Sequence, residues 1–321
     1  MDIIIRGVRA EDRAQILEVE RKSTPGLVYL PRVFEQFLND AEGEFLAGEV
    51  DGTLAGCAKF TRLPDGSAWL ETLRVIPERQ GLGVGKQFYQ RFFEIARSRH
   101  ITTMRMYTGV TNHTSKGLAE RFGFRVAGTY RGQKYALSTA SIPTAPPAFQ
   151  PARDPDLAVD LLLAQREAWA GFVVMNRTFY AVTPALGRYL ARHALLYHDP
   201  GSGSMVVLGA RFMPWQALHI AALAGDVDAC LAFAAQQAAQ TGAASLSCLS
   251  PVTAGQVQSA LQARGFAFEP SDFIVMPLAP SLFSVQGLRN LGPTVQAWRE
   301  QWRHRLAAKP HDLELPMPSG A

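Results

Sequence analysis

Cysteine is scarce in this sequence, and its absence excludes two classes of site. Only three cysteines occur among 321 residues. Their wide spacing fits neither a disulfide framework nor a zinc site. We therefore expect Cys57, Cys230 and Cys248 to be buried small hydrophobic side chains, and we expect no bound metal.

Long apolar runs are also missing. No stretch approaches the roughly 18 consecutive apolar residues that a membrane helix requires. The start, Met1-Asp2-Ile3, lacks the basic and apolar segments of a signal peptide. Low-complexity tracts are absent as well, and hydrophobic residues make up 47% of the chain, which is typical of a folded globular protein. We expect a cytoplasmic protein without membrane contact.

A strong charge of either sign is lacking too. The formal net charge is +4, and the whole excess lies in residues 1–137, because acidic and basic residues balance in the remainder. Such a surplus suits a small polyanionic ligand but gives little support for nucleic-acid binding. We expect no nucleic-acid partner.

The chain is long enough for two hydrophobic cores, and a proline-rich segment separates its halves. Residues 138–151 hold four prolines and no charged side chain, which favours an extended connector. We therefore expect one domain at 1–137, a linker at 138–151 and a second domain at 152–321.

The first 137 residues alternate between strand and helix patterns. Apolar side chains at helical spacing predict helices at 11–22, after Pro31, at 84–99 and at 112–121. Strands are expected at 3–5, 44–50, 53–63, 68–75, 103–110, 125–130 and 133–137. The second to fourth of these strands form an antiparallel meander with tight turns. The order predicts a mixed sheet with helices.

The second half repeats the end of this pattern. Val110-Thr111 and Gly123-Phe124 recur as Val252-Thr253 and Gly265-Phe266 at one offset of 142 residues. Further patterns predict strands at 218–223, 245–249 and 273–278 and a helix at 227–240. We infer two copies of one fold. A last helix is expected at 295–306, where Trp298 and Trp302 would pack against a domain or a partner.

A glycine-rich loop lies between the strand ending at Val75 and the helix beginning near Val84. Gly81, Gly83 and Gly85 allow unusual dihedral angles, so several backbone N–H groups can converge on an anion at the helix N-terminus. The plain alternative is a helix entered through a flexible turn. The loop lacks the Lys-Ser/Thr ending of a triphosphate P-loop, and an antiparallel meander precedes it instead of a parallel dinucleotide-binding unit.

These residues resemble the GNAT acetyltransferase superfamily. Its signature Q/R-x-x-G-x-G/A is met by Gln80-Gly81-Leu82-Gly83-Val84-Gly85. Further matching motifs are Ile5-Arg6 before Asp12, Leu73-Arg74-Val75-Ile76-Pro77-Glu78, and Asn112 with Ser115 before Phe122-Gly123-Phe124. The resemblance implies a mixed α/β (α+β) protein of two tandem GNAT-like domains, each with a mostly antiparallel, twisted, mixed sheet flanked by helices.

The resemblance also implies that acetyl-CoA binds the first domain as co-substrate. In the family the pyrophosphate lies on the loop amides, and the pantetheine arm pairs with the preceding strand. Arg79 would either neutralise phosphate or remain solvated, and so would Lys86. Asn112 matches a pantetheine contact, although capping the next helix is an equally good role. The implied cofactor-binding residues are Leu73, Val75, Gln80, Gly81, Gly83, Val84, Gly85, Lys86 and Asn112.

Acetyl transfer to an amine needs a group that takes the amine proton. Glu71 is the candidate catalytic base, because strand alternation places it on the same face as Leu73 and Val75. Its alternative role is that of an ordinary solvent-facing charge on a strand.

An acid can also protonate the leaving thiolate. Many members of the family use a tyrosine in the helix after the asparagine, but that position is Ala119 here. Tyr107 is the candidate catalytic substitute, and Tyr130 and Tyr135 are others. A tyrosine on a strand, such as Tyr107, is also readily explained as a core residue.

The second copy has lost the features of a phosphate site. Only Ala224 separates its strand from Gly225, and Asp226-Val227-Asp228 places two negative charges where amides would meet phosphate. The asparagine position is Ala254. We expect this copy to wall the substrate cleft or to mediate assembly, for example of a homodimer.

These arguments predict an N-acetyltransferase that moves acetyl from acetyl-CoA to a primary amine. The leading acceptor is a small molecule, and the variant acceptor is a protein N-terminus or lysine. The alternative is a non-catalytic acyl-CoA-binding protein with a regulatory or interaction role, which the missing tyrosine and the degenerate copy favour. Release of thiol in the presence of amines distinguishes the two.

Overall fold

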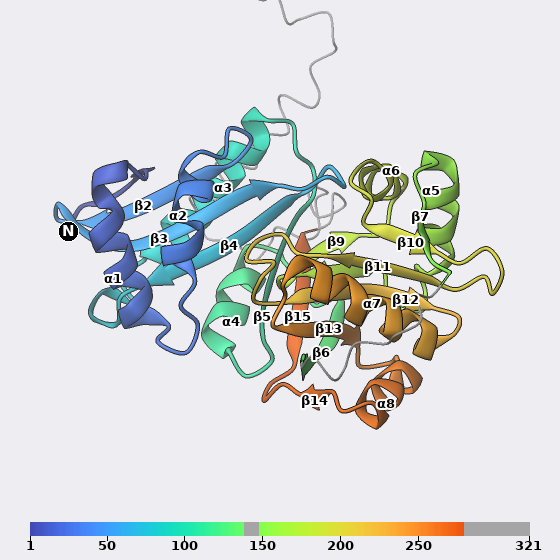
Figure 1. Ribbon diagram of the computed structural model, residues 1–321. Coiled ribbons are helices and arrows are strands. Elements are labelled where there is room, and N and C mark those ends of the chain that lie inside the picture. Colours follow the sequence, from blue (N-terminus) through green and yellow to red (C-terminus); the bar gives the residue numbers. More distant parts are fainter. Residues whose placement is uncertain (138–147, 279–321) are drawn as a thin grey trace, which may run out of the picture.

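Among the described residues, one long sheet of 13 strands runs through both halves of the chain in the computed structural model (Figure 1). The structure describes residues 1–137 and 148–278. Most of the expected linker at 138–151 and the whole expected helix at 295–306 therefore lie outside the described residues. Helices pack on both faces of the sheet. The expected class, a mixed and mostly antiparallel sheet flanked by helices, is confirmed.

The elements of the first half follow the order expected from the sequence. They are β1 (Ile3–Gly7), α1 (Arg13–Ser23), α2 (Leu30–Leu38), β2 (Glu44–Val50), β3 (Thr53–Arg62), β4 (Ala68–Val75), α3 (Val84–Ser98), β5 (Met104–Gly109), α4 (His113–Arg121) and β6 (Gly128–Ala136). On one face, Phe34 and Phe37 of α2 pack against Phe45 of β2. On the other face, Phe92 of α3 packs against Phe60 of β3. The sheet thus lies between two helical layers.

The second half contains the expected repeat. Its elements are β7 (Gln150–Pro151), α5 (Pro155–Ala164), β8 (Phe172–Met175), β9 (Thr178–Ala181), α6 (Pro184–Arg192), β10 (Leu196–His198), β11 (Met205–Gly209), β12 (Leu218–Ala224), α7 (Val227–Thr241), β13 (Ser245–Pro251), α8 (Gly255–Ala263), β14 (Ala267–Phe268) and β15 (Phe273–Leu278). The helices α4 and α8 begin and end at the same offset of 142 residues. Gly123 and Gly265 follow them, both with φ of +88°, the left-handed backbone that often ends a helix.

The last described strand of each half, β6 or β15, pairs with strands of the other half. The strand order is β1-β2-β3-β4-β5-β15-β6-β13-β12-β11-β10-β7, and β14 pairs with β6. β15 pairs antiparallel with β5, with Val275 opposite Tyr107. β6 pairs antiparallel with β13, with Gln133 opposite Cys248. In Figure 1 β15 accordingly lies among strands of the first half.

Two strands expected at 125–130 and 133–137 are a single strand in the structure, so that expectation was wrong. β6 continues through Arg131 and Gly132. Its first part pairs with β15, and the remainder pairs with β13 and β14, so the ladder has no gap where the strand would end. The division of the chain into domains at 138–151 stays a prediction, and strand pairing crosses it in both directions.

The scarce cysteines lie inside the protein. Cys57, Cys230 and Cys248 are all buried and free, as expected. Burial raises the pKa of the Cys57 and Cys248 thiols to about 12. Within residues 1–137 and 148–278, no helix has the length and apolar character needed to cross a membrane.

Candidate functional site

The sheet of the first half opens between β4 and β5. These parallel strands pair only at their beginnings, where the last pair is Leu70 with Met106. β4 continues to Val75 and β5 to Gly109 without further pairing between them in the described chain. Thr72 has φ of +61°, and the register between β3 and β4 shifts beside it. Such a bulge bends a strand, so β4 past Leu70 presents a free backbone edge.

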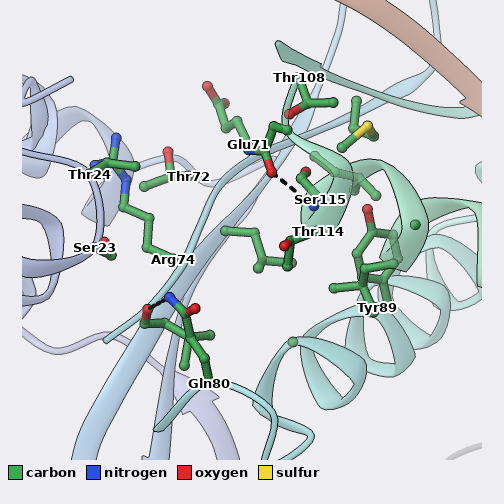
Figure 2. Close-up of a pocket in the computed structure, with 18 of the residues that line it drawn as sticks. Ser23, Thr24, Glu71, Thr72, Arg74, Gln80, Tyr89, Thr108, Thr114 and Ser115 are labelled. Carbon is green, nitrogen blue, oxygen red and sulfur yellow. Dashed lines mark hydrogen bonds between the residues drawn. The ribbon is translucent and has the colours of Figure 1, made fainter. Parts of the chain in front are cut away.

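A cavity of about 890 Å³ occupies this opening. Its walls come from β4, β5, the glycine-rich loop, α3 and α4 (Figure 2), together with the α1–α2 loop and two residues of the second half, Arg177 and Phe273. The expected catalytic residues Glu71 and Tyr107 line it. So do all the expected cofactor-binding residues: Leu73, Val75, Gln80, Gly81, Gly83, Val84, Gly85, Lys86 and Asn112.

The glycine-rich loop presents free backbone amides to the cavity. Gly81 and Gly83 have φ of +78° and +98°, which favours glycine because a side chain would be strained there. The N–H of Gln87 donates to the carbonyl of Gly83 at 3.1 Å. The N–H groups of residues 84–86 precede this bond, so they have no partner within the helix. Such an arrangement fits a pyrophosphate.

Side chains around the loop hold its shape and supply positive charge. Nε2 of Gln80 donates to the carbonyl of Val75 at 3.0 Å (Figure 2), which ties the loop to the end of β4. A Cβ on Gly85 would lie 2.9 Å from the side chain of Leu118, so glycine allows α3 to lie close to α4. Lys86 lines the cavity, where its ammonium group can attract phosphate.

Asn112 caps the helix α4. Its Oδ1 accepts a hydrogen bond from the backbone N–H of Ser115 at 3.0 Å (Figure 2). The structural alternative is therefore observed, and the residue also lines the cavity. A contact with pantetheine stays a prediction.

Glu71 lies in the middle of β4, at the end of the opening away from the glycine-rich loop, as Figure 2 shows by the positions of Glu71 and Gln80. Its Oε1 accepts from Nη2 of Arg211 at 2.6 Å and its Oε2 from Nη1 at 2.8 Å. Oε1 also accepts from the hydroxyl of Thr61 at 2.6 Å. The side chain is buried, so it is not a solvent-facing strand charge. Because both oxygens already accept hydrogen bonds, an incoming amine must share or displace one of them.

Tyr107 lies beside Glu71 in the aromatic wall of the cavity. Its ring stacks on Trp69 with 5.8 Å between centroids and also contacts Phe273. Burial raises the pKa of the Tyr107 phenol, and the neighbouring guanidinium of Arg177 opposes that rise. The phenol therefore stays protonated near neutral pH, as a proton donor requires.

The two other tyrosines considered as acids have structural roles. The hydroxyl of Tyr130 donates to the carbonyl of Trp169 at 2.9 Å in the core of the second half. Tyr135 stacks on Phe266 with 5.3 Å between centroids. Neither lines the cavity, so among the three candidates the structure favours Tyr107.

Comparison with known proteins gives an independent assignment. Residues 13–124 match the model described as the Acetyltransferase (GNAT) family. The chain carries a GNAT acetyltransferase domain. A protein of Bacillus subtilis (strain 168), provisionally named a ribosomal protein bS18-alanine N-acetyltransferase, is 25% identical over 125 residues, which are 39% of this chain and 82% of that protein. The expected enzyme class, an acyltransferase, is thereby confirmed.

Solved structures extend the likeness beyond this GNAT domain. A GCN5-related N-acetyltransferase from Sphaerobacter thermophilus aligns with a TM-score of 0.57 and 14% identity, over 86% of this chain and 95% of its own. A tandem GNAT protein from the clavulanic acid biosynthesis pathway aligns with a TM-score of 0.56 and 12% identity, over 87% of this chain and 99% of its own. These likenesses concern the fold, and they confirm a tandem arrangement of two GNAT-like halves.

The second half has a similar opening, but a tryptophan fills it. β12 and β13 are parallel and pair only from Leu218 to Ile220. Beyond that point the indole N–H of Trp169 donates to the carbonyl of Leu223 at 3.2 Å, in the position where the GNAT domain has a free edge. The carboxylate of Asp226 accepts two backbone N–H groups at the start of α7. The backbone N–H groups that an anion would need at this helix N-terminus therefore already donate hydrogen bonds to Asp226.

Several residues shape the cavity of the GNAT domain in ways that the sequence did not predict. Arg74 is buried, pairs with Glu20 at 3.1 Å and donates to the carbonyl of Leu27 at 3.0 Å. These contacts hold the α1–α2 loop over the cavity. The hydroxyl of Tyr29 in this loop lies 2.6 Å from that of Thr72. The available signal for Arg74 was a second charged residue, besides Glu71, in a strand that is otherwise mostly apolar.

Proposed function

We propose that the protein is an N-acetyltransferase that transfers acetyl from acetyl-CoA to the primary amine of a small molecule. The observation that carries the proposal is the opening between β4 and β5. Free helix N-terminal amides lie at one end of this opening, and Glu71 and Tyr107 lie at the other.

The residues of the first half fit acetyl-CoA. The amides of the glycine-rich loop would hold the pyrophosphate, and the cavity-lining Arg79 and Lys86 would offset its charge. The free edge of β4 at Leu73 and Val75 offers backbone groups to the amides of pantetheine. Acetyl-CoA supplies the activated acetyl group.

The transfer requires two proton movements. The amine nitrogen forms a bond to the acetyl carbon, and the carbon–sulfur bond breaks with its electron pair passing to sulfur. One proton leaves the amine and one reaches the thiolate. In this proposal Glu71 takes the first, directly or through water, and Tyr107 gives the second.

The second half supports a small acceptor. The ring of Phe212 stacks on that of Tyr29 with 5.9 Å between centroids, and Arg177 and Arg211 lie at the same end of the site. Tyr29 and Arg177 line the cavity, whereas Phe212 and Arg211 support its acceptor end through their contacts with Tyr29 and Glu71. The Bacillus subtilis relative is named for a protein acceptor, but its match covers 39% of this chain. A protein N-terminus is therefore the second candidate acceptor.

Thiol release measured on the full-length chain tests the proposal. The protein is incubated with acetyl-CoA and either a panel of small primary amines or peptides that begin with alanine. We expect release with at least one small amine. Release of thiol with peptides only would show that the acceptor is a protein N-terminus and not a small molecule. Tight CoA binding without release for any amine would favour the non-catalytic acyl-CoA-binding alternative, which the occupied oxygens of Glu71 make worth testing.

A further inference from the structure

Two loops of the second half reach the acceptor end of the GNAT domain. One is the turn between β8 and β9, with Asn176 and Arg177, and the other is the connection between β11 and β12, with Arg211 and Phe212. The side chain of Asn176 joins them. Its Oδ1 accepts from the backbone N–H of Arg211 at 2.6 Å, and its Nδ2 donates to the carbonyl of Phe212 at 3.0 Å. The two loops are therefore fixed to each other.

The first half anchors the same hairpin. Asp65, in the turn between β3 and β4, accepts from the backbone N–H of Ala181 at 2.6 Å and pairs with Arg105. Nε of Arg105 donates to the carbonyl of Phe179 at 3.3 Å. The carboxylate of Asp65 and the guanidinium of Arg105 are buried. The two loops of the second half are thus held in place on the GNAT domain.

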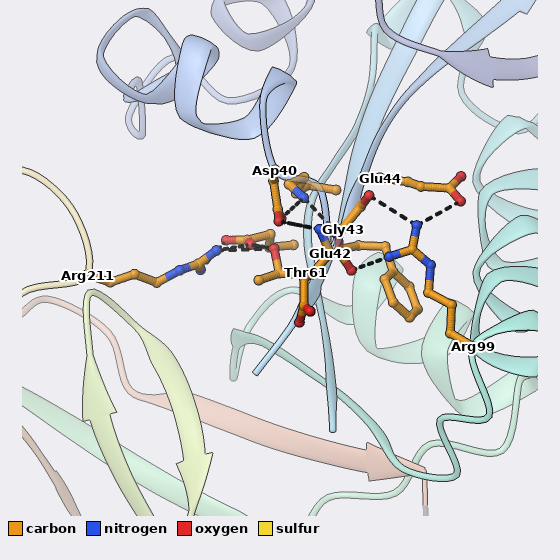
Figure 3. Close-up of polar contacts among 10 residues, drawn as sticks. Asp40, Glu42, Gly43, Glu44, Thr61, Arg99 and Arg211 are labelled. Atoms are coloured by element: carbon orange, nitrogen blue, oxygen red, sulfur yellow. Dashed lines mark hydrogen bonds and ion pairs between the residues drawn. The ribbon is translucent and has the colours of Figure 1, made fainter. Parts of the chain in front are cut away.

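Arg211 fixes the carboxylate of Glu71 in a two-point ion pair. The guanidinium also donates to the hydroxyl of Thr178 at 3.0 Å and to that of Thr61 at 3.1 Å. Figure 3 shows Arg211 extending from its loop to Thr61. A two-point arginine–carboxylate pair sets the orientation of the carboxylate as well as adding energy. Because the pair is buried, removal of the cation would leave Glu71 uncompensated.

Arg177 lies beside Tyr107. Asn176 and Arg177 have φ of +47° and +58°, a conformation that is strained for arginine and recurs at functional sites. The guanidinium lies 4.5 Å from the ring centre of Phe273 and pairs with Glu269 at 2.8 Å. Its side chain nevertheless remains 30% exposed and lines the cavity.

We propose that Arg177 and Arg211 are positioning residues through which the second half takes part in acetyl transfer by the GNAT domain. Arg211 holds Glu71 in a fixed orientation, and Arg177 stands against Tyr107. Both act at the end of the opening that lies away from the glycine-rich loop. Through these two arginines the second half therefore affects the chemical step, and their loss should leave cofactor binding unchanged. This inference rests on the proposed acetyltransferase function.

A double-mutant cycle on the full-length protein tests Arg211. The variants are Arg211→Gln, Glu71→Gln and the double variant, and the measurements are kcat and the Kd of CoA. We expect Arg211→Gln to lower kcat by about 10²-fold with an unchanged Kd, since loss of a positioned proton acceptor has this size. The double variant should lose no more than Glu71→Gln, because Arg211 acts through Glu71. Additive losses, or a wild-type kcat in Arg211→Gln, would overturn the inference.

Arg211→Lys provides a second test in case Arg211→Gln does not fold. It retains the positive charge but cannot make the two-point contact. We expect an intermediate kcat and the wild-type Kd of CoA, which shows that the cofactor site is folded. A wild-type kcat in Arg211→Lys would contradict the orienting role.

The pH profile of kcat tests Arg177. The charge of Arg177 opposes the rise in the pKa of Tyr107, so Arg177→Met should raise that pKa further. The activity that depends on a protonated phenol should then persist to higher pH, and kcat at neutral pH should fall by about 10-fold. Arg177→Lys should restore the original profile. If Arg177 had only a structural role, its loss would not shift the high-pH limb of the profile. An unshifted high-pH limb in Arg177→Met would therefore exclude the proposed action of Arg177 on Tyr107.

Arg264→Gln is the matched control. Arg264 also belongs to the second half, and it pairs with the carboxylate of Asp228. The side chain of Asp228 is well exposed. Its loss should change neither kcat nor the Kd of CoA. If the wild type releases no thiol with any amine, the proposed function fails and this inference fails with it. If the wild type turns over and the variants of both arginines match it, this inference alone fails.

Discussion

At the residue scale, Gly83 is where cofactor binding should be most sensitive to substitution. Gly83→Glu places a side chain and a negative charge beside the free amides of the loop, and we expect the affinity for CoA to fall by more than about 100-fold. The nearest side-chain atom to an added Cβ, Cδ1 of Ile3, lies 3.9 Å away. The fold should therefore tolerate the side chain itself.

Gly83→Ala is the control for Gly83→Glu. It adds only the strain of a Cβ at φ of +98°, which costs about 1–3 kcal/mol of stability. Calorimetric titration with CoA should therefore show a far smaller loss for Gly83→Ala than for Gly83→Glu. Equal affinities of Gly83→Glu and wild type would refute the phosphate cradle.

Also at the residue scale, His219 predicts how stability depends on pH. It is buried on β12, and its Nε2 has no partner among the described residues. Burial, and to a lesser extent the charges of Arg177 and Lys134, lower its pKa from 6.5 to about 4. Between these values the unfolded chain binds a proton that the folded chain does not. The stability from this group is complete above pH 6.5, and about 2 kcal/mol should be lost between pH 7 and pH 5.

Denaturant unfolding at pH 7 and pH 5 measures this contribution of His219. His219→Gln cannot titrate and serves as the reference. The free energy of unfolding of the wild type should fall by about 2 kcal/mol more than that of the variant. Parallel losses in the two proteins would show that His219 is protonated without penalty in the folded state.

At the scale of elements, local patterns predicted where strands and helices lie. β2 and β4 have the expected bounds, 44–50 and 68–75, and α3 ends one residue before its expected end. Alternation, tight turns and helical spacing are properties of neighbouring residues, so the sequence reveals them. The partner of a strand is not local. Nothing in the pattern of β6 or β15 indicates that each pairs with strands of the other half.

The same difference between local patterns and distant contacts applies to the candidate site. The cofactor-binding residues were predicted because the loop is one contiguous motif. The two arginines of the acceptor end were not, because Arg211 lies 140 residues after Glu71 and Arg177 lies 70 residues after Tyr107 in the sequence. The β8–β9 hairpin was missed because Arg177 follows Asn176 in its turn, where the usual hairpin signal would be glycine.

The filled opening between β12 and β13 gives a prediction at this scale. Trp169 is 2% exposed and satisfies the carbonyl of Leu223. Trp169→Ala leaves a cavity and an unpaired carbonyl, so we expect a loss of about 3–5 kcal/mol in the free energy of unfolding. It should not create a second CoA site, because the carboxylate of Asp226 still occupies the start of α7.

Trp215→Ala is the matched control for Trp169→Ala. Its side chain is 53% exposed, and the expected change in stability is within about 0.5 kcal/mol. Denaturant unfolding measures both variants, and calorimetry counts the CoA molecules bound per chain. A second bound CoA in Trp169→Ala would contradict the role of Asp226.

At the scale of the whole molecule, the exchanged strands make the halves depend on each other. β15 lies between β5 and β6, so it completes the sheet that contains the cofactor site. β6 lies between β15 and β13, so it completes the sheet of the second half. The second half therefore supports the GNAT domain in two ways, through a strand of its sheet and through the two arginines at its acceptor end.

Separation of the halves tests this dependence. A fragment of residues 1–137 leaves the edges of β5 and β6 unpaired, and long unpaired edges promote aggregation. We expect neither this fragment nor residues 138–321 alone to bind CoA with the affinity of the intact chain. Co-expressed fragments should restore binding, because both exchanged strands are then present. As a control, a protease site within 138–147 should leave affinity unchanged after cleavage. Binding of CoA by the isolated fragment 1–137 at full affinity would show that β15 is dispensable for the cofactor site.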